Sequence, residues 1–203
     1  MEQSQTRRDA IVEAMIRVAG SKGYLATSVA DVLTEASVSR TTFYKHFDDK
    51  HECFLAAHDL AIERLLAATM AACEGRRGWG KRARAGLTGA VELLADDAPL
   101  GRTAIVEATV AGTAARERQM IAIGCFAQLL EVEPPPVRSA LPANTALMAV
   151  GAVAGLILDG LQAEPAVDLS RLLPELEFAL LVPFIGPRAA AEAYGAPASS
   201  ASA

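Results

Sequence analysis

Apolar residues recur with the period of an α-helix along most of the chain, and no segment shows the alternation of a strand. The clearest helical segment begins at Ser28, which can cap a helix. Asp31 stands three positions on, where a carboxylate can reach back to the cap. The apolar positions that follow share one helix face: Val29, Val32, Leu33 and Ala36. The pattern predicts a short amphipathic helix over residues 28–36.

A second short helix is predicted directly after the first. Ser37 and Val38 make the turn, and Ser39 can cap the new helix. Phe43 and Phe47 lie one turn apart and supply its buried face. The opposite face is polar and basic and consists of Arg40, Thr41, Thr42, Tyr44, Lys45 and His46. This helix carries no acidic residue, so nothing in it repels phosphate, and its residue types suit the major groove of DNA.

Seven further helices are predicted from the same periodicity and from the glycines and prolines that interrupt it. They cover residues 6–22, 49–74, 81–95, 99–112, 114–132, 143–162 and 168–186. We expect Tyr24 and Leu25, after the first of them, to pack beneath the two short helices. The chain is therefore predicted to be all-α, with about nine helices and a helix-turn-helix over residues 28–47.

The helix over residues 143–162 is apolar almost all round, which predicts that it is buried. Gly151, Ala152 and Gly155 are small and allow another helix to approach closely. Together with residues 168–186, this helix can be buried against a second subunit or against the earlier helices of its own chain. The two alternatives are compatible.

Composition agrees with a globular protein but not with a generic nucleic-acid binder. The chain has 203 residues, 52% of them hydrophobic, and a net charge of −5. Basic and acidic residues cancel over residues 1–50, so the negative excess lies beyond them. Any affinity for DNA must therefore come from a local arrangement of charge.

The sequence gives no sign of a membrane protein or an enzyme. The first residues are polar, and the longest apolar run, residues 146–158, is shorter than the roughly 20 residues that span a bilayer. No catalytic constellation, phosphate loop or metal spacing is present, so we expect neither a cofactor nor a metal. Cys53, Cys73 and Cys125 are read as reduced thiols of a cytoplasmic protein, with a thiol-based redox sensor as an alternative.

Two groups of charged residues in the second half have a plain and a functional interpretation. Glu107, Glu117 and Glu131 are isolated carboxylates, interpreted as surface charge, although Glu107 stands among apolar residues and can line a pocket. A basic cluster follows the helix that ends near residue 74 and consists of Arg76, Arg77, Lys81, Arg82 and Arg84. It is interpreted as a solvated turn, or else as the anion-attracting mouth of a site for a phosphorylated or acyl-CoA-like ligand.

A specific set of residues in the first third of the chain matches a known pattern. The set comprises Thr27-Ser28-Val29, Asp31-Val32, Ala36, Val38-Ser39, Thr42-Phe43-Tyr44, His46-Phe47, Lys50, Glu52 and Leu55. With these residues, the segment 6–66 closely resembles the TetR family of bacterial transcription regulators. Family members usually carry Gly where this chain has Ser37 and Ala where it has Leu33.

The resemblance implies contacts with double-stranded DNA. It places Thr27, Ser28, Tyr44, His46 and Lys50 against phosphates, and Arg40, Thr41, Thr42 and Lys45 against bases or nearby backbone. With the helix cap, the expected DNA-binding set is Thr27, Ser28, Ser39, Arg40, Thr41, Thr42, Tyr44, Lys45, His46 and Lys50.

The resemblance also implies a division of labour along the chain. Residues 1–50 would form the DNA-binding domain, residues 51–188 a helical effector-binding and dimerisation domain, and residues 189–203 a disordered tail. The helices over 143–162 and 168–186 would pair with their twins in a homodimer. A small, largely apolar effector would bind near Leu66, Met70, Val106, Met120, Ile123, Phe126, Leu130 and Met148. The expected protein is a ligand-responsive repressor of a palindromic operator, with an activator of the same fold as an alternative.

Overall fold

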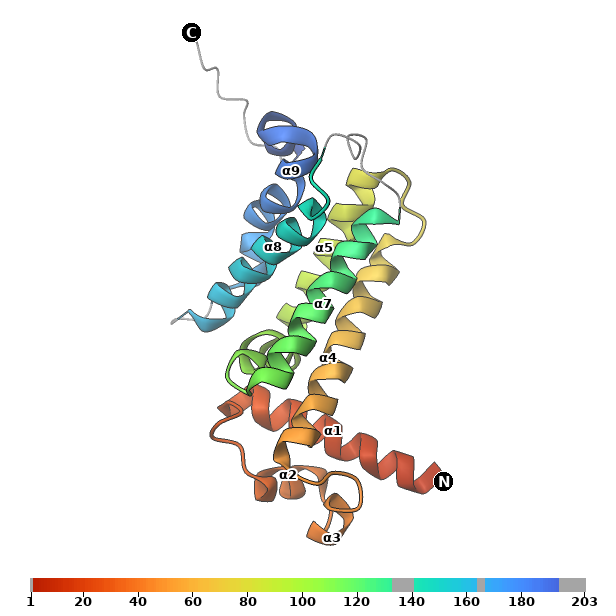
Figure 1. The fold of residues 1–203 in the computed structure, drawn as a ribbon, viewed down its shortest axis with the longest axis vertical. Helices are drawn as coiled ribbons and strands as arrows, with labels where there is room; N and C mark the ends of the chain where they lie inside the picture. Colours follow the sequence, from red (N-terminus) through yellow and green to blue (C-terminus); the bar gives the residue numbers. More distant parts are fainter. Residues whose placement is uncertain (1, 133–140, 164–166, 194–203) are drawn as a thin grey trace. The chain divides into compact units, whose positions relative to one another are not determined.

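The computed structural model describes residues 2–132, 141–163 and 167–193, and these residues form helices and connecting turns with no strand among them (Figure 1). The predicted all-α class is confirmed. The α-helices are α1 (Glu2–Lys22), α2 (Val29–Ala36), α3 (Arg40–Phe43), α4 (Lys50–Cys73), α5 (Trp79–Asp96), α6 (Ala98–Gly101), α7 (Thr113–Glu131), α8 (Thr145–Gln162) and α9 (Leu173–Ala193). Shorter turns are η1 (Arg102–Val106), η2 (Glu107–Thr109) and η4 (Leu169–Leu172).

The chain divides into two compact units. The first unit comprises Met1–Leu65 and Leu93–Ile121, and the second comprises Leu66–Glu92 and Ala122–Ala203. The first unit thus contains the predicted DNA-binding residues 1–50 together with part of α4 and the segment that includes α6. Three helices, α4, α5 and α7, each contribute residues to both units.

The core of the first unit forms around α1, which packs against α2, α6 and η1. Ile11, Ala14 and Met15 are fully buried on its inner face, as the apolar spacing predicts. Gly20 is where α6 comes closest, because a Cβ atom there would stand 2.1 Å from the carbonyl oxygen of Pro99. Only glycine permits this approach of the two backbones.

The segment after Asp97 differs from the single helix predicted over residues 99–112. Asp97 caps α6 by accepting the Leu100 amide at 3.0 Å, but the chain then passes through the π-helical turn η1 and the 3₁₀ turn η2. Within η1, the Thr103 hydroxyl donates to the Ile16 carbonyl of α1 at 3.1 Å, in a buried position. Tertiary contacts that the local sequence does not contain therefore set the geometry of this segment.

The second unit contains a packed pair of helices, α8 and α9. Leu176, Leu181 and Phe184 of α9 are buried, and the Phe184 ring lies 4.7 Å from that of Trp79, centroid to centroid. The Trp79 indole in turn donates to the Leu130 carbonyl at 2.9 Å. These contacts join α5, α7 and α9 within the unit.

The last helix runs past the predicted end of helical structure. Gly186, with φ of 78°, interrupts α9, which then continues to Ala193. Residues 189–193 of the predicted tail are therefore helical, and the rest of that tail lies outside the described residues.

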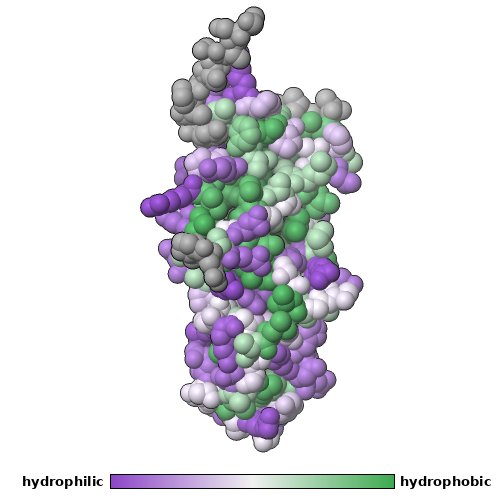
Figure 2. Space-filling model, turned by 90° about the vertical axis from the view of Figure 1, so that its left-hand side faces the viewer, coloured by the Kyte–Doolittle hydropathy of each residue, from purple (hydrophilic) through white to green (hydrophobic). Residues whose placement is uncertain are grey.

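Helix α8 is much less buried than its apolar sequence predicts. Leu147, Met148 and Leu156 are exposed by 37%, 67% and 40%, and nothing lies within 4 Å of a Cβ added at Gly151 or Gly155. Figure 2 shows hydrophobic side chains gathered over a face of the second unit. By length and composition, α8 also passes the test for a membrane-crossing helix, a test that core helices of soluble proteins pass as well.

Candidate nucleic-acid interface

The first helix of the motif is capped as the sequence predicts. The Ser28 hydroxyl accepts the Asp31 amide at 3.3 Å, and Asp31 accepts the Ser28 amide at 2.7 Å, which completes a capping box. The Asp31 carboxylate also pairs with Lys22 at 2.6 Å. Hydrogen bonds from Lys22 and Ser28 hold the pKa of Asp31 well below its ordinary value. The carboxylate therefore stays charged at the start of α2, where the helix dipole favours it.

The turn between α2 and α3 uses a left-handed backbone conformation at Ser37. Its φ and ψ are 53° and 41°, and it is the one non-glycine residue with positive φ in the described part of the chain. The amides of Ser37 and Val38 donate to the carbonyls of Thr34 and Leu33 at 3.2 and 3.1 Å. The turn closes α2 in the manner of a left-handed helix cap, at a conformational cost that glycine would not incur.

Helix α3 is shorter than predicted, but its two faces are placed as expected. Ser39 caps it by accepting the Thr42 amide at 3.1 Å, and α3 ends at Phe43. Turns continue the chain, with the Phe47 amide donating to the Phe43 carbonyl at 3.0 Å. Phe43 and Phe47 are both buried, which confirms the apolar face. Their burial fixes which side of this segment faces outward.

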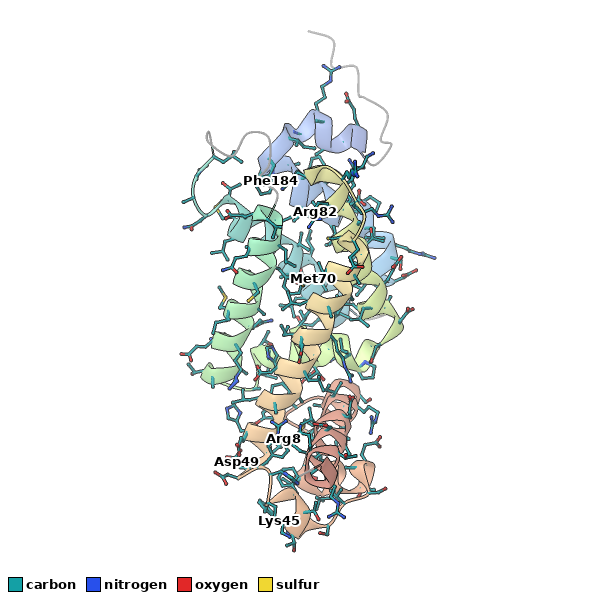
Figure 3. All side chains as sticks on the ribbon, turned by 90° about the vertical axis from the view of Figure 1, so that its right-hand side faces the viewer. Arg8, Lys45, Asp49, Met70, Arg82 and Phe184 are labelled. Carbon is teal, nitrogen blue, oxygen red and sulfur yellow. The ribbon has the colours of Figure 1, made fainter. Side chains whose placement is uncertain are left out.

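The outward side carries the predicted base-facing residues. The structure leaves Ser39, Arg40, Thr41, Tyr44 and Lys45 exposed, with Thr42 and His46 half-buried. Figure 3 shows Lys45 at the outer end of the first unit, pointing away from its helices. The Arg40 guanidinium lies 5.9 Å from the Tyr44 ring centroid. This surface therefore offers a guanidinium, hydroxyls and an ammonium side by side.

Two of the predicted phosphate contacts form hydrogen bonds within the protein. Thr27 is buried, and its hydroxyl donates to the Gly23 carbonyl at 2.8 Å. The Lys50 ammonium donates to the carbonyls of Tyr24 and Thr27 at 3.0 and 2.9 Å. It also lies 4.1 Å from the centroid of the Tyr24 ring. Since an ammonium has three donors, one hydrogen of Lys50 is left for a phosphate.

Residues 11–57 match the model of a family described as bacterial regulatory proteins, tetR family. This segment of the chain thus matches the TetR family. The residues matched include the whole of α2, its turn and α3, and the resemblance inferred from the sequence is confirmed. TetR-family proteins are transcriptional regulators, and this chain has their fold.

Solved TetR-like structures match the chain over nearly its whole length. The fatty acid degradation regulator FadR from Bacillus halodurans aligns with a TM-score of 0.74 and 16% identity, covering 90% of this chain and 96% of its own. FadR from Bacillus subtilis, solved in complex with stearoyl-CoA, gives 0.71 and 15%, with 87% and 97% covered. The regulator TylP from Streptomyces fradiae gives 0.60 and 24%, with 93% and 90% covered. A comparison with curated proteins finds no match.

The residues predicted to bind the effector are divided between the two units. Val106 and Met120 belong to the first unit, and the other six belong to the second: Leu66, Met70, Ile123, Phe126, Leu130 and Met148. Val106 and Leu130 are buried, whereas Met70, Met120 and Met148 are more than half exposed. Figure 3 marks Met70 on α4. The predicted effector site therefore remains a hypothesis, and most of its residues lie in the second unit.

The first unit contains a cavity that the sequence does not predict. It has a volume of about 450 Å³ and lies between α1 and α4, with one residue from α7. Its lining includes the apolar residues Val12, Leu55 and Leu60 and also Arg118, which pairs with Asp59 at 3.2 Å.

In the described structure, the basic cluster is exposed or partly buried, and the cysteines form no disulfide. Arg76, Arg77 and Lys81 are exposed, while Arg82 and Arg84 are partly buried in α5. All three cysteines are free, and burial raises the pKa of the Cys53 thiol to about 12. Because the thiolate is the reactive form, burial of Cys53 disfavours the redox-sensor alternative at this residue.

Two residues that lie behind the motif were not predicted to support it. Tyr24 was expected only to pack beneath the motif, but its backbone is bonded on both sides, to Lys50 and to Glu107. Glu107 was interpreted as surface charge and is 4% exposed. Its position among apolar residues was the available signal. Leu25, expected to pack with Tyr24, is 73% exposed, so that prediction is wrong.

Proposed function

We propose that this TetR-family protein is a ligand-responsive repressor in the cytoplasm that binds a palindromic DNA operator as a homodimer. The observation that carries the proposal is the outward surface of α3. Arg40 and Thr41 are exposed on it, Ser39 caps its N-terminus, and the exposed Lys45 lies in the turn that follows it. Arg can donate two hydrogen bonds to guanine, Thr can contact bases or a thymine methyl, and Lys can neutralise phosphate.

A second copy of this chain is the proposed partner of α8. Met148, Ala152, Gly155 and Asp159 are exposed and follow each other at spacings of four, three and four residues, so they form one stripe along the helix. Leu156 adds to the same face. The small residues on the stripe allow two helices to approach closely. In a homodimer the two-fold axis would present the two α3 surfaces to a palindrome.

The proposed effector is a small, largely apolar molecule. The observations that support it are the apolar residues Ile123, Phe126 and Leu130 of α7 in the second unit and the exposed basic residues near the start of α5. The FadR of Bacillus subtilis was solved with stearoyl-CoA, which joins an apolar tail to an anionic head. Acyl-CoA thioesters are therefore the first compounds to test. A ligand switches the protein only if it binds the DNA-free state more tightly than the DNA-bound state.

The deciding experiment selects bound sequences from random duplex DNA with the full-length protein at low salt. The expected product is a palindrome with half-sites about one helical turn, or 10–10.5 base pairs, apart. Its position upstream of genes in the source genome would then name candidate targets. Repression is checked with a reporter under a promoter that contains the site. Absence of enrichment over the starting pool would overturn the proposal.

A further inference from the structure

A buried carboxylate joins the segment after α6 to the turn that follows α1. Oε2 of Glu107 accepts the backbone amide of Tyr24 at 2.7 Å, across 83 residues of sequence. Its other oxygen, Oε1, lies 3.3 Å from the Arg102 guanidinium. Glu107 is 4% exposed, so water solvates its carboxylate poorly and these partners must stabilise the charge.

The ammonium group of Lys50 binds carbonyl groups of the same turn. The Lys50 ammonium donates to the carbonyls of Tyr24 and Thr27 and lies against the Tyr24 ring. The amide of Tyr24 is thus bonded to a carboxylate, and its carbonyl is bonded to an ammonium. Charge-assisted hydrogen bonds are roughly twice as strong as neutral ones, so the backbone at Tyr24 is firmly fixed.

The fixed turn leads directly into the start of α2. The Thr27 amide and hydroxyl both donate hydrogen bonds to the Gly23 carbonyl, at 3.1 and 2.8 Å. Ser28, the next residue, is the cap of α2. Gly23 has φ of 89°, and a Cβ there would lie 3.6 Å from Oε2 of Glu107, so the carboxylate packs over this glycine. Hydrogen bonds therefore connect the turn at Tyr24 to Thr27, the residue before the cap of α2.

The backbone around Glu107 is adapted to this contact. The π turn η1 precedes Glu107, and within it the Thr103 hydroxyl donates to the Ile16 carbonyl at 3.1 Å. Thr103 and Glu107, four residues apart, thus both bury a polar group against the region of α1 and its following turn. Single π turns inside helical segments are frequent at functional sites.

We propose that Glu107 is a positioning residue for DNA binding. It holds the Tyr24 amide from one side while Lys50 holds the carbonyls from the other, and together they fix the start of α2 at Thr27 and Ser28. This inference rests on the proposed DNA-binding function. Glu107 itself touches no DNA, and its removal weakens the complex by loosening the start of α2.

The test compares Glu107→Ala and Glu107→Gln with Glu117→Ala, which removes an exposed carboxylate of α7. DNA affinity is measured by fluorescence anisotropy on a selected duplex at several salt concentrations. Hydrogen exchange at the Tyr24 amide is measured on the free protein. Glu107→Ala should lower affinity about ten-fold, by loss of a hydrogen bond to a charged group, and speed exchange at Tyr24. The slope of affinity against salt should stay unchanged, because no phosphate contact is lost.

Glu107→Gln keeps a carbonyl acceptor, so it should recover affinity to within about three-fold and show intermediate exchange at Tyr24. Glu117→Ala should match the parent in both measurements. If Glu107→Ala does not fold, parent-like exchange at Tyr24 in Glu107→Gln overturns the inference. In a folded Glu107→Ala, unchanged affinity or unchanged exchange overturns it too. A parent that binds no duplex refutes the proposed function instead, and the exchange measurement still tests the contact.

Discussion

The ammonium nitrogen of Lys50 lies 2.9 Å from the carbonyl oxygen of Thr27, so a predicted phosphate contact also closes the turn before α2. The same nitrogen bonds the Tyr24 carbonyl at 3.0 Å. A single side chain therefore serves two proposed roles, one in the free protein and one on DNA. The two roles make different predictions when the side chain is removed.

Lys50→Ala should weaken DNA binding and also reduce the free energy of unfolding. We expect a loss of about 1–3 kcal/mol in stability from the two internal hydrogen bonds, measured by urea denaturation. The salt slope of DNA binding should fall by about 1 if a phosphate contact is lost as well. Lys45→Ala, at an exposed position, is the control: it should lower the affinity and slope but leave stability within about 0.5 kcal/mol. Unchanged stability in Lys50→Ala would show that the internal bonds contribute nothing.

Ser37→Gly should stabilise the protein. Ser37 has φ of 53°, a left-handed conformation in which glycine avoids the contact between Cβ and the backbone. We expect the free energy of unfolding to rise by about 1 kcal/mol. The neighbouring change Ala36→Gly, at the last residue of α2, should lower it by up to about 1 kcal/mol. If both changes destabilise the protein equally, the strain at Ser37 is not real.

Gly20→Ala should destabilise the first unit. The added methyl group would stand 2.1 Å from the Pro99 carbonyl oxygen, so α1 and α6 must separate. A loss of about 2–3 kcal/mol is expected, the usual effect of overpacking in a core. Gly124→Ala is the matched control in α7, since nothing lies within 4 Å of its added methyl, and it should be neutral or slightly stabilising. A Gly20→Ala protein as stable as the parent would contradict the close approach.

Met148→Glu should shift the protein from dimer to monomer. Met148 is 67% exposed on the stripe of α8 described above, and a charge there would be buried at the proposed interface. Light scattering on a size-exclusion column should show at least about ten-fold weaker dimerisation. Val132→Glu, at a residue that is also 67% exposed, controls for the added charge. A monomeric parent at micromolar concentration would refute the proposed homodimer.

His58 should make the protein less stable in mild acid. Burial lowers its pKa from 6.5, outweighing the nearby Asp59 carboxylate, whose oxygen lies 3.9 Å from Nδ1 of His58. Since the unfolded chain then binds more protons, the free energy of unfolding falls as pH falls below about 7 and levels off below the folded-state pKa. His58→Gln should reduce this fall when urea midpoints are compared at about pH 7.5 and about pH 5.5. An equal fall in parent and variant would exclude His58 as its cause.

Part of the candidate site follows from local sequence alone. Caps at Ser28 and Ser39 and burial of Phe43 and Phe47 depend on residues within one or two helical turns of each other. Hydrogen bonds and side-chain packing at that range are encoded by spacing, so both short helices and the outward side of α3 could be predicted.

The remaining features depend on partners that are distant in sequence. Glu107 meets the Tyr24 amide across 83 residues, and no spacing rule connects them. The helix predicted over 99–112 is divided into α6, η1 and η2, where Thr103 and Glu107 bond to distant parts of the first unit.

The sequence by itself determined the helical class and the helix-turn-helix, because both follow from short-range periodicity and residue type. The residues of the motif also carried the resemblance to the TetR family. The tertiary structure decided which polar groups turn inward. Lys50 and Thr27 carry residue types suited to phosphate, yet both satisfy backbone carbonyls of the turn before α2. It also decided how far α8 is covered within its own chain. Whether a side chain faces inward or outward is decided only when the fold brings a partner within bonding distance of it.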